Sequence, residues 1–86
     1  MSDLEERYGF AASVAGLTDE QLVARFNREV GNRAWGNARM YFLSCLGNEI
    51  RKRDFDSTIV HSDSGGLKLS RRVRLTDGSL EFESDS

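Results

Sequence analysis

The stretch RRVRLTDGSLEFE, residues 71–83, decides the fold. Apolar and polar side chains alternate along it, and the pair Asp77-Gly78 at its centre is typical of the two-residue turn of a β-hairpin. Because such a turn fixes the register, residues at equal distances from it face each other across the two strands. The apolar face then carries Leu75 opposite Leu80 and Val73 opposite Phe82. The stretch therefore predicts an antiparallel hairpin with one buried face.

The opposite face of the predicted hairpin pairs unlike charges. Arg74 faces Glu81, and Arg72 faces Glu83 in the same register. Cross-strand pairs of opposite charge contribute roughly 0.2–1 kcal/mol each. The turn, the apolar alternation and the charges agree on one structure, so we expect both arginines to be occupied by their neighbours.

Arg71 breaks this alternation, because it falls on the apolar face between Leu69 and Val73. An unpaired charge on an apolar face is costly. One interpretation is structural: Arg71 reaches out to water at the rim of the sheet, or pairs with an acidic side chain of a helix. The other interpretation is functional: Arg71 binds an anion or the carboxylate of a partner.

A further strand is expected before the hairpin. Residues 57–62 contain Thr58, Ile59 and Val60, and a turn signal follows at residues 63–66. Residues 57–84 then form a three-stranded antiparallel β-meander. Residues 84–86, at the end of the chain, are expected to fray.

Upstream of the sheet the apolar period is that of helices. Residues 18–30 predict a helix that a Thr18–Gln21 capping box begins and Gly31 ends. Residues 33–53 predict a second, longer helix, with Asn32 as its cap and with basic side chains in its last turn. Together, residues 18–53 form a helical hairpin. Residues 1–16 are either a weakly structured arm or a short third helix.

The second predicted helix is apolar over an unusually wide arc. At 100° per residue its apolar side chains cover about 200°, against ~100° for a one-sided helix. We therefore expect cover on two sides, by the first helix or by a second subunit. Gly36 and Gly47 lie on one flank and would let another helix backbone approach closely. The candidates for interface contacts are Trp35, Arg39, Met40 and Tyr41.

Arg39 lies inside this apolar arc, one turn from Trp35. Stacking on the Trp35 ring is a structural explanation for the charge. The alternative is an interface, since Trp, Tyr and Arg are enriched at interface hot spots. Glu49 lies in the same arc, and we expect it to pair with Arg39, with Arg71 or with a basic residue of a partner.

These expectations define an α+β fold in a single domain, residues 1–86. Two antiparallel helices, with or without a short helix before them, pack on one face of the three-stranded meander. The expected core is Leu22, Phe26, Val30, Phe42, Leu46, Ile50, Leu69, Val73, Leu75, Leu80 and Phe82.

Charge is unevenly distributed along the 86-residue chain, whose formal net charge is −2. Residues 25–74 hold eleven of the twelve basic side chains but only five of the fourteen acidic ones. A basic middle is compatible with nucleic-acid binding in a winged-helix arrangement. The phosphate contacts would then be Arg33, Arg39, Arg51, Lys52, Arg53 and Arg71. The overall acidity and the paired hairpin arginines argue against this alternative.

No catalytic or metal-binding motif is apparent. His61, Ser62 and Asp63 are adjacent in sequence, whereas a catalytic triad needs such groups brought together in space by different segments. Asp54 and Asp56 fit a helix exit and turn better than a metal loop. We therefore expect a protein that is not an enzyme and that binds no cofactor or metal.

The lone cysteine, Cys45, excludes an internal disulfide, and no apolar run approaches the ~18 residues of a membrane span. The N-terminus lacks the basic and apolar regions of a signal peptide. We expect a cytoplasmic protein that does not contact a membrane. The leading hypothesis is a small non-enzymatic protein-interaction module, either a homodimer or a subunit of a larger assembly.

Overall fold

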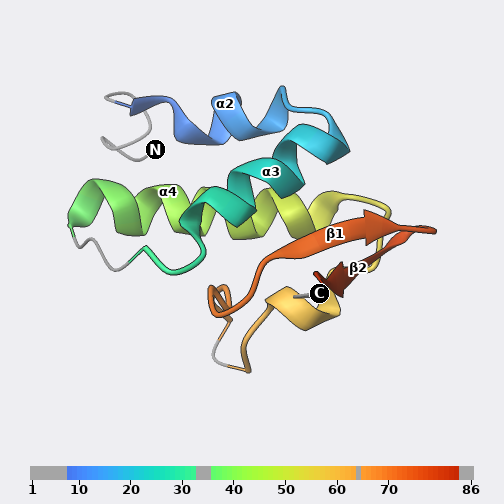
Figure 1. Ribbon diagram of the computed structural model, residues 1–86. Helices are drawn as coiled ribbons and strands as arrows, with labels where there is room; N and C mark the ends of the chain where they lie inside the picture. Colours follow the sequence, from blue (N-terminus) through green and yellow to red (C-terminus); the bar gives the residue numbers. More distant parts are fainter. Residues whose placement is uncertain (1–7, 33–35, 64, 84–86) are drawn as a thin grey trace.

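The computed structural model describes residues 8–32, 36–63 and 65–83, and it places helices against one β-hairpin (Figure 1). The elements are α2 (Phe10–Ala15), α3 (Asp19–Glu29), α4 (Asn37–Lys52), the 3-10 turn η1 (Thr58–Val60), β1 (Val73–Thr76) and β2 (Ser79–Phe82). In Figure 1, α2 lies along α4, while α3 crosses α4 obliquely and runs in the opposite direction. The α+β class is as predicted. No helix in these ranges is long and apolar enough to cross a membrane.

Helix α3 begins where the sequence predicts. The Thr18 hydroxyl accepts a hydrogen bond from the Gln21 backbone N–H at 3.1 Å, and the Gln21 side chain accepts one from the Thr18 N–H at 2.9 Å. This reciprocal capping box satisfies two of the N–H groups that a helix start leaves unpaired. Gly31 follows the helix with φ of +78°, in the left-handed region where a glycine is least strained.

Helix α4 begins later than predicted. Its first residue is Asn37 and its N-cap is Gly36, so the predicted cap at Asn32 is wrong. Residues 33–35, and with them Trp35, lie outside the described ranges.

The wide apolar arc of α4 is covered on two sides within the chain. Helix α2 lies against one side, where the Phe10 ring meets Phe42 edge-on with centroids 5.2 Å apart and lies 6.0 Å from the Tyr41 ring. Helix α3 crosses on another side (Figure 1). Val14 of α2 is almost fully buried in this contact region. In the described part of α4, the cover predicted on two sides is given by α2 and α3 of the same chain.

The hairpin has the predicted register. Val73 pairs with Phe82, Arg74 with Glu81, Leu75 with Leu80 and Thr76 with Ser79. Asp77 and Gly78 both have positive φ, as the favoured two-residue hairpin turn requires. The outer face carries both predicted ion pairs, with 3.6 Å between Arg74 Nη2 and Glu81 Oε2 and 3.8 Å between Arg72 Nε and Glu83 Oε2.

The predicted three-stranded meander is wrong, because the described residues form a sheet of two strands. Residues 57–62 turn instead of extending. The Asp56 carboxylate accepts hydrogen bonds from the Thr58 N–H at 2.9 Å and the Thr58 hydroxyl at 2.6 Å, and these bonds lower the pKa of Asp56. Such side-chain bonds compete with strand pairing and favour a turn. The 3-10 turn η1 follows directly.

The residue just before this segment bonds to the hairpin. Asp56 donates its N–H to the Gly78 carbonyl and accepts from the Leu80 N–H, both at 2.8 Å. The resulting bridge with Ser79 is parallel and a single residue long. The chain therefore reaches the outer edge of β2, as a third strand would, but leaves it after one residue.

Most of the predicted core is buried. Leu22, Phe26, Phe42, Leu46, Ile50, Val73 and Leu80 are buried, and Val30, Leu69 and Leu75 are partly buried. Phe82 is a wrong prediction, since it is 40% exposed at the open end of the hairpin. Phe55 and Val60 are core residues that the prediction missed, because the turn after α4 folds inward where a strand was expected.

Asn27 joins the helices to the sheet. Its side-chain amide donates to the Val73 carbonyl at 2.7 Å and accepts from the Val73 N–H at 2.8 Å, and Asn27 is itself buried. The amide thus occupies the outer edge of β1 as the backbone of a neighbouring strand would. Unpaired backbone groups at a buried edge are costly, so this contact both positions α3 and satisfies the sheet.

We predict that Asn27→Ala lowers the free energy of unfolding by about 2–4 kcal/mol, because it leaves both polar groups of Val73 buried and unpaired. Urea unfolding measures the loss. The matched control is Asn48→Ala on the exposed face of α4, with an expected change below about 0.5 kcal/mol. Equal stability of the two variants would contradict the role given to Asn27.

Candidate functional site

Arg53 is committed to holding the helices together. Its guanidinium contacts Glu49 through Nε and Asp19 through Nη1, each at 2.8 Å. Nη2 donates to the carbonyls of Leu17 at 2.8 Å and Val14 at 3.3 Å. The bonds to Asp19 and Glu49 raise the pKa of Arg53 above its ordinary value. Arg53 therefore links the end of α4 to the junction between α2 and α3. It also pairs with Glu49, so the predicted pairing of Glu49 with Arg39 or Arg71 is wrong.

Arg39 is likewise committed within the chain. It contacts the Glu29 carboxylate at 3.1 Å and donates to the Asn32 carbonyl at 3.1 Å. Arg25 reaches the same carboxylate at 3.3 Å and lies over the Phe42 ring, 4.5 Å from its centroid. The Glu29 side chain is only 10% exposed. The charge inside the apolar arc is therefore balanced by a buried acid of α3, and the predicted stacking on Trp35 lies outside the described residues.

Arg71 lies over a ring of its own hairpin. Its guanidinium carbon is 4.5 Å from the centroid of the Phe82 ring, and Nη2 donates to the Glu83 carbonyl at 3.4 Å. This cation–π arrangement covers part of the exposed ring. Arg71 is itself exposed, and it borders a shallow cleft of about 290 Å³ together with Ser70 and Arg72.

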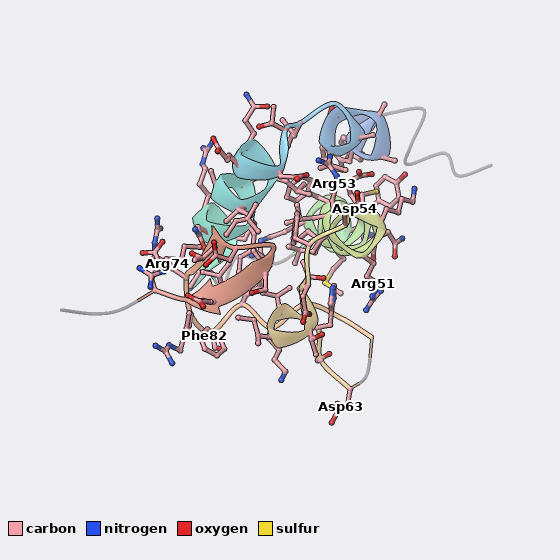
Figure 2. All side chains as sticks on the ribbon, turned by 90° about the vertical axis from the view of Figure 1, so that its right-hand side faces the viewer. Arg51, Arg53, Asp54, Asp63, Arg74 and Phe82 are labelled. Carbon is pink, nitrogen blue, oxygen red and sulfur yellow. The ribbon has the colours of Figure 1, made fainter. Side chains whose placement is uncertain are left out.

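His61 forms a dyad with Ser57 rather than with its sequence neighbours. The Ser57 Oγ and His61 Nε2 atoms are 2.9 Å apart, while Nδ1 is buried without a hydrogen-bond partner. A nucleophilic serine needs access to substrate and a base that a third group orients. Ser57 is only 8% exposed, and Asp63 lies at the tip of its loop and points away (Figure 2). The pair therefore stabilises the turn η1.

The candidate metal ligands do not converge. Among residues 8–32, 36–63 and 65–83, no three or more His, Cys, Asp or Glu side chains gather where they could hold a metal ion. Cys45 is buried and unpaired in the core, where a free cysteine behaves as a small apolar side chain.

A cleft runs along the remaining side of α4. We name it the Met40 cleft. Its volume is about 340 Å³, and it lies between one face of the helix and the loop that returns from η1 to the hairpin. Its lining is Met40, Leu43, Ser44, Gly47, Asn48 and Arg51 from α4, and Gly65, Gly66 and Leu67 from the loop. Recurrence every three or four residues puts the six helix residues on one face.

The loop wall of the Met40 cleft is tied down. The Ser62 N–H donates to the Gly66 carbonyl at 2.8 Å, and the Lys68 N–H donates to the Val60 carbonyl at 2.8 Å. Leu67 packs over Gly47 so closely that a Cβ atom built there would be 3.4 Å from the Leu67 Cγ. The close approach predicted for another helix at Gly47 is therefore made by Leu67.

Arg51 closes one end of the Met40 cleft. Its Nη2 donates to the Gly65 carbonyl at 2.6 Å. Figure 2 shows Arg51 on the side of α4 that faces the loop, with Asp63 turned away from it. In the described part of the chain no carboxylate lies within ion-pair distance of Arg51, unlike the other arginines at the ends of α4. The sequence placed Arg51 in the last turn of the helix and, under the nucleic-acid alternative, among the phosphate contacts. Nothing in its spacing revealed the loop opposite it.

The chain matches no protein-family model, no curated protein and no solved structure in comparisons with known proteins. Its function must then be inferred from its own surface, where the Met40 cleft combines exposed apolar groups with an arginine that has no acidic partner.

We predict that Arg53→Ala lowers the free energy of unfolding by about 2–4 kcal/mol, because the 12%-exposed Glu49 carboxylate loses its partner. Chemical denaturation measures the change. Lys52→Ala, one residue away and exposed, is the control and is expected to cost less than about 0.5 kcal/mol. If both variants lose the same amount, Arg53 is a surface charge without the linking role.

The lowered pKa of His61 should make the stability of the protein depend on pH. Burial lowers the pKa of His61 below its ordinary value, and the positive charge of Arg51 lowers it further. As pH falls through the ordinary value of about 6.5, the unfolded chain takes up a proton that the folded chain does not. The stability from neutral His61 is thus fully present above that pH and is lost as pH falls toward the lowered folded-state pKa.

We predict that the variant His61→Gln, whose amide can keep the bond to Ser57, lacks this pH-dependent part of the stability. The measurement is the free energy of unfolding of both proteins from pH 8 to pH 5. The advantage of the wild type over the variant should shrink as pH falls. An advantage that stays constant across the range would show that His61 titrates equally in both states.

Proposed function

We propose that this protein is a small non-enzymatic interaction module that binds a partner protein at the Met40 cleft. The observation that carries the proposal is the exposure of Met40, which is 56% and the highest among the large apolar residues that the structure describes. Met40 lines the cleft together with two further apolar residues, Leu43 and Leu67. A cytoplasmic location, expected from the lone cysteine, is part of the proposal.

The size and composition of the cleft favour a binding role. Ligand pockets in proteins typically measure about 300–1,000 Å³ and combine apolar walls with a few polar groups. The Met40 cleft, at about 340 Å³, lies at the lower end of this range. Methionine is flexible and polarizable, which suits it to apolar contacts of variable shape.

A protein partner fits the charges better than a nucleic acid. Of the arginines that a winged-helix binder would use, Arg39 and Arg53 are held by carboxylates and Arg71 lies over Phe82. Of the candidate phosphate contacts that the structure describes, Arg51 and Lys52 at the end of α4 are exposed and have no carboxylate or ring partner. Phosphate-dominated binding draws on several free cations at once, and the described surface offers few in one place.

The proposal names a partner other than a second copy. The expectation of a homodimer came from the apolar arc of α4, and α2 and α3 cover that arc. What remains uncovered is a narrow cleft lined by a helix face and a loop, which suits a segment of chain better than a flat second subunit.

The test uses a phage-displayed library of random twelve-residue peptides, selected on the immobilised full chain. We predict enrichment of peptides whose binding is weakened at least tenfold by Met40→Glu, since a buried methionine contributes about 1.5–3 kcal/mol. Ser13→Glu adds the same charge at an exposed position of α2 and is expected to leave binding unchanged.

Two results would contradict the proposal. One is the absence of any enriched peptide. The other is a wild-type dimer in sedimentation equilibrium that Met40→Glu dissociates, which would put a second copy in the cleft.

A further inference from the structure

The Met40 cleft differs sharply in chemistry between its two ends. One end is formed by Met40 and Leu43, and Leu67 packs over Gly47 next along the helix; none of these side chains is charged. At the other end stands Arg51, which is the only charged side chain among the lining residues. Ser44 and Asn48 lie between the two ends on the exposed face of α4. A ligand that fills the cleft must therefore satisfy an apolar end and a positive end at once.

Arg51 is held in place but not neutralised. The bond from Nη2 to the Gly65 carbonyl fixes the guanidinium against the loop at 2.6 Å. Five other arginines of the described chain each have a carboxylate within 4 Å: Arg25, Arg39, Arg53, Arg72 and Arg74. Guanidinium presents five N–H donors in a planar fork that matches a carboxylate. Arg51 therefore offers a positioned donor group at a solvent-exposed cleft.

The positive charge of Arg51 acts on a neighbouring titratable group, His61. It is one of the two causes that lower the pKa of His61, the other being burial. The acidic side chains in this region do not offset it, since Asp63 points away from the helix (Figure 2) and Asp56 is bonded to Thr58. An anionic group of a ligand would be the missing counter-charge.

The spacing of the two ends sets the length of the ligand. Met40 and Arg51 are separated by eleven helical positions, which at ~1.5 Å per residue is about 16 Å. An extended chain advances ~3.3 Å per residue, so about five residues span the cleft. Ser44 and Asn48 stand along this path, where their side chains can bond to the backbone of the bound segment.

From this arrangement we infer that the Met40 cleft recognises an extended protein segment of about five residues, with an apolar side chain at one end and a carboxylate at the other. The apolar side chain packs between Met40 and Leu67, and the carboxylate pairs with Arg51. The inference rests on the proposed function and adds the chemistry of the partner to it.

The test takes peptides enriched on the wild-type chain and measures their affinities by fluorescence polarization. We expect an apolar residue and a Glu or Asp about four positions apart in the enriched set. Replacing that acid by its amide should weaken binding at least tenfold, as should Arg51→Gln in the protein. Lys52→Gln removes a neighbouring cation outside the cleft lining, and its expected effect is less than twofold.

Exchanging the charges of Arg51 and of the peptide's acid distinguishes a loss of recognition from a loss of folding. Arg51→Glu should bind the selected peptides at least tenfold more weakly, and a peptide with Lys in place of the acid should regain affinity for this variant alone. That recovery cannot come from a protein that has failed to fold.

Enriched peptides that depend on Met40 but show no acid, and that bind Arg51→Gln as well as the wild type, would overturn the inference and leave the proposed function standing. Absence of any enriched peptide would overturn both.

Discussion

The buried amide of Asn27 is the contact on which the rest of the architecture depends. It pairs with both backbone groups of Val73 and so fixes α3 against the edge of β1. A hairpin of two four-residue strands is too small to be stable alone, and it requires a helix against its apolar face. The opposite edge is secured by Asp56, whose backbone bonds to Gly78 and Leu80. Both edges of the hairpin are thus bonded to other parts of the chain. The loop that leaves η1 returns along α4, and the Met40 cleft lies between this loop and α4.

The arginines fall into two groups: those paired with carboxylates within the fold and those without a carboxylate partner in the described chain. Arg53 joins three helices at one point, and Arg39 balances a buried acid. On the hairpin, Arg72 and Arg74 have cross-strand partners. Arg51 combines a fixed position in the Met40 cleft with the lack of a carboxylate partner in the described chain. Arg71 also has no carboxylate within ion-pair distance, but its guanidinium lies over the Phe82 ring. Most arginines of the basic middle segment are therefore paired with carboxylates within the fold. Arg51 is not, and it lines the same cleft as the exposed Met40.

Local rules predicted well those elements that local interactions determine. The capping box at Thr18 and the register set by Asp77-Gly78 follow from neighbours in sequence, and both are confirmed. The predicted strand at residues 57–62 failed because β-branched side chains favour strands, whereas Asp56 bonds to Thr58 and turns the chain. Sequence pattern could not decide between these competing preferences.

The site was harder to predict than the fold. Met40 was among the candidates, and Arg51 lies on the same helix. The opposite wall of the cleft, with Leu67, comes from a loop that only the tertiary structure brings against that helix. The remaining candidates, Arg39 and Arg71, drew attention as charges that break an apolar pattern. Arg39 meets a buried acid from another helix and Arg71 a ring on its own strand pair, and neither partner is visible in the local periodicity.

The most direct test of the Met40 cleft as a binding site is an NMR titration of the full chain with a selected peptide. The spectra should record the Met40 methyl group and the arginine Nε–H groups together. The account predicts that the Met40 methyl and the Arg51 Nε–H signals shift in parallel along one binding curve, while the Arg53 Nε–H signal, already bonded to Glu49, stays in place. Shifts that spare both Met40 and Arg51 and gather instead at Arg71 and Phe82 would contradict it.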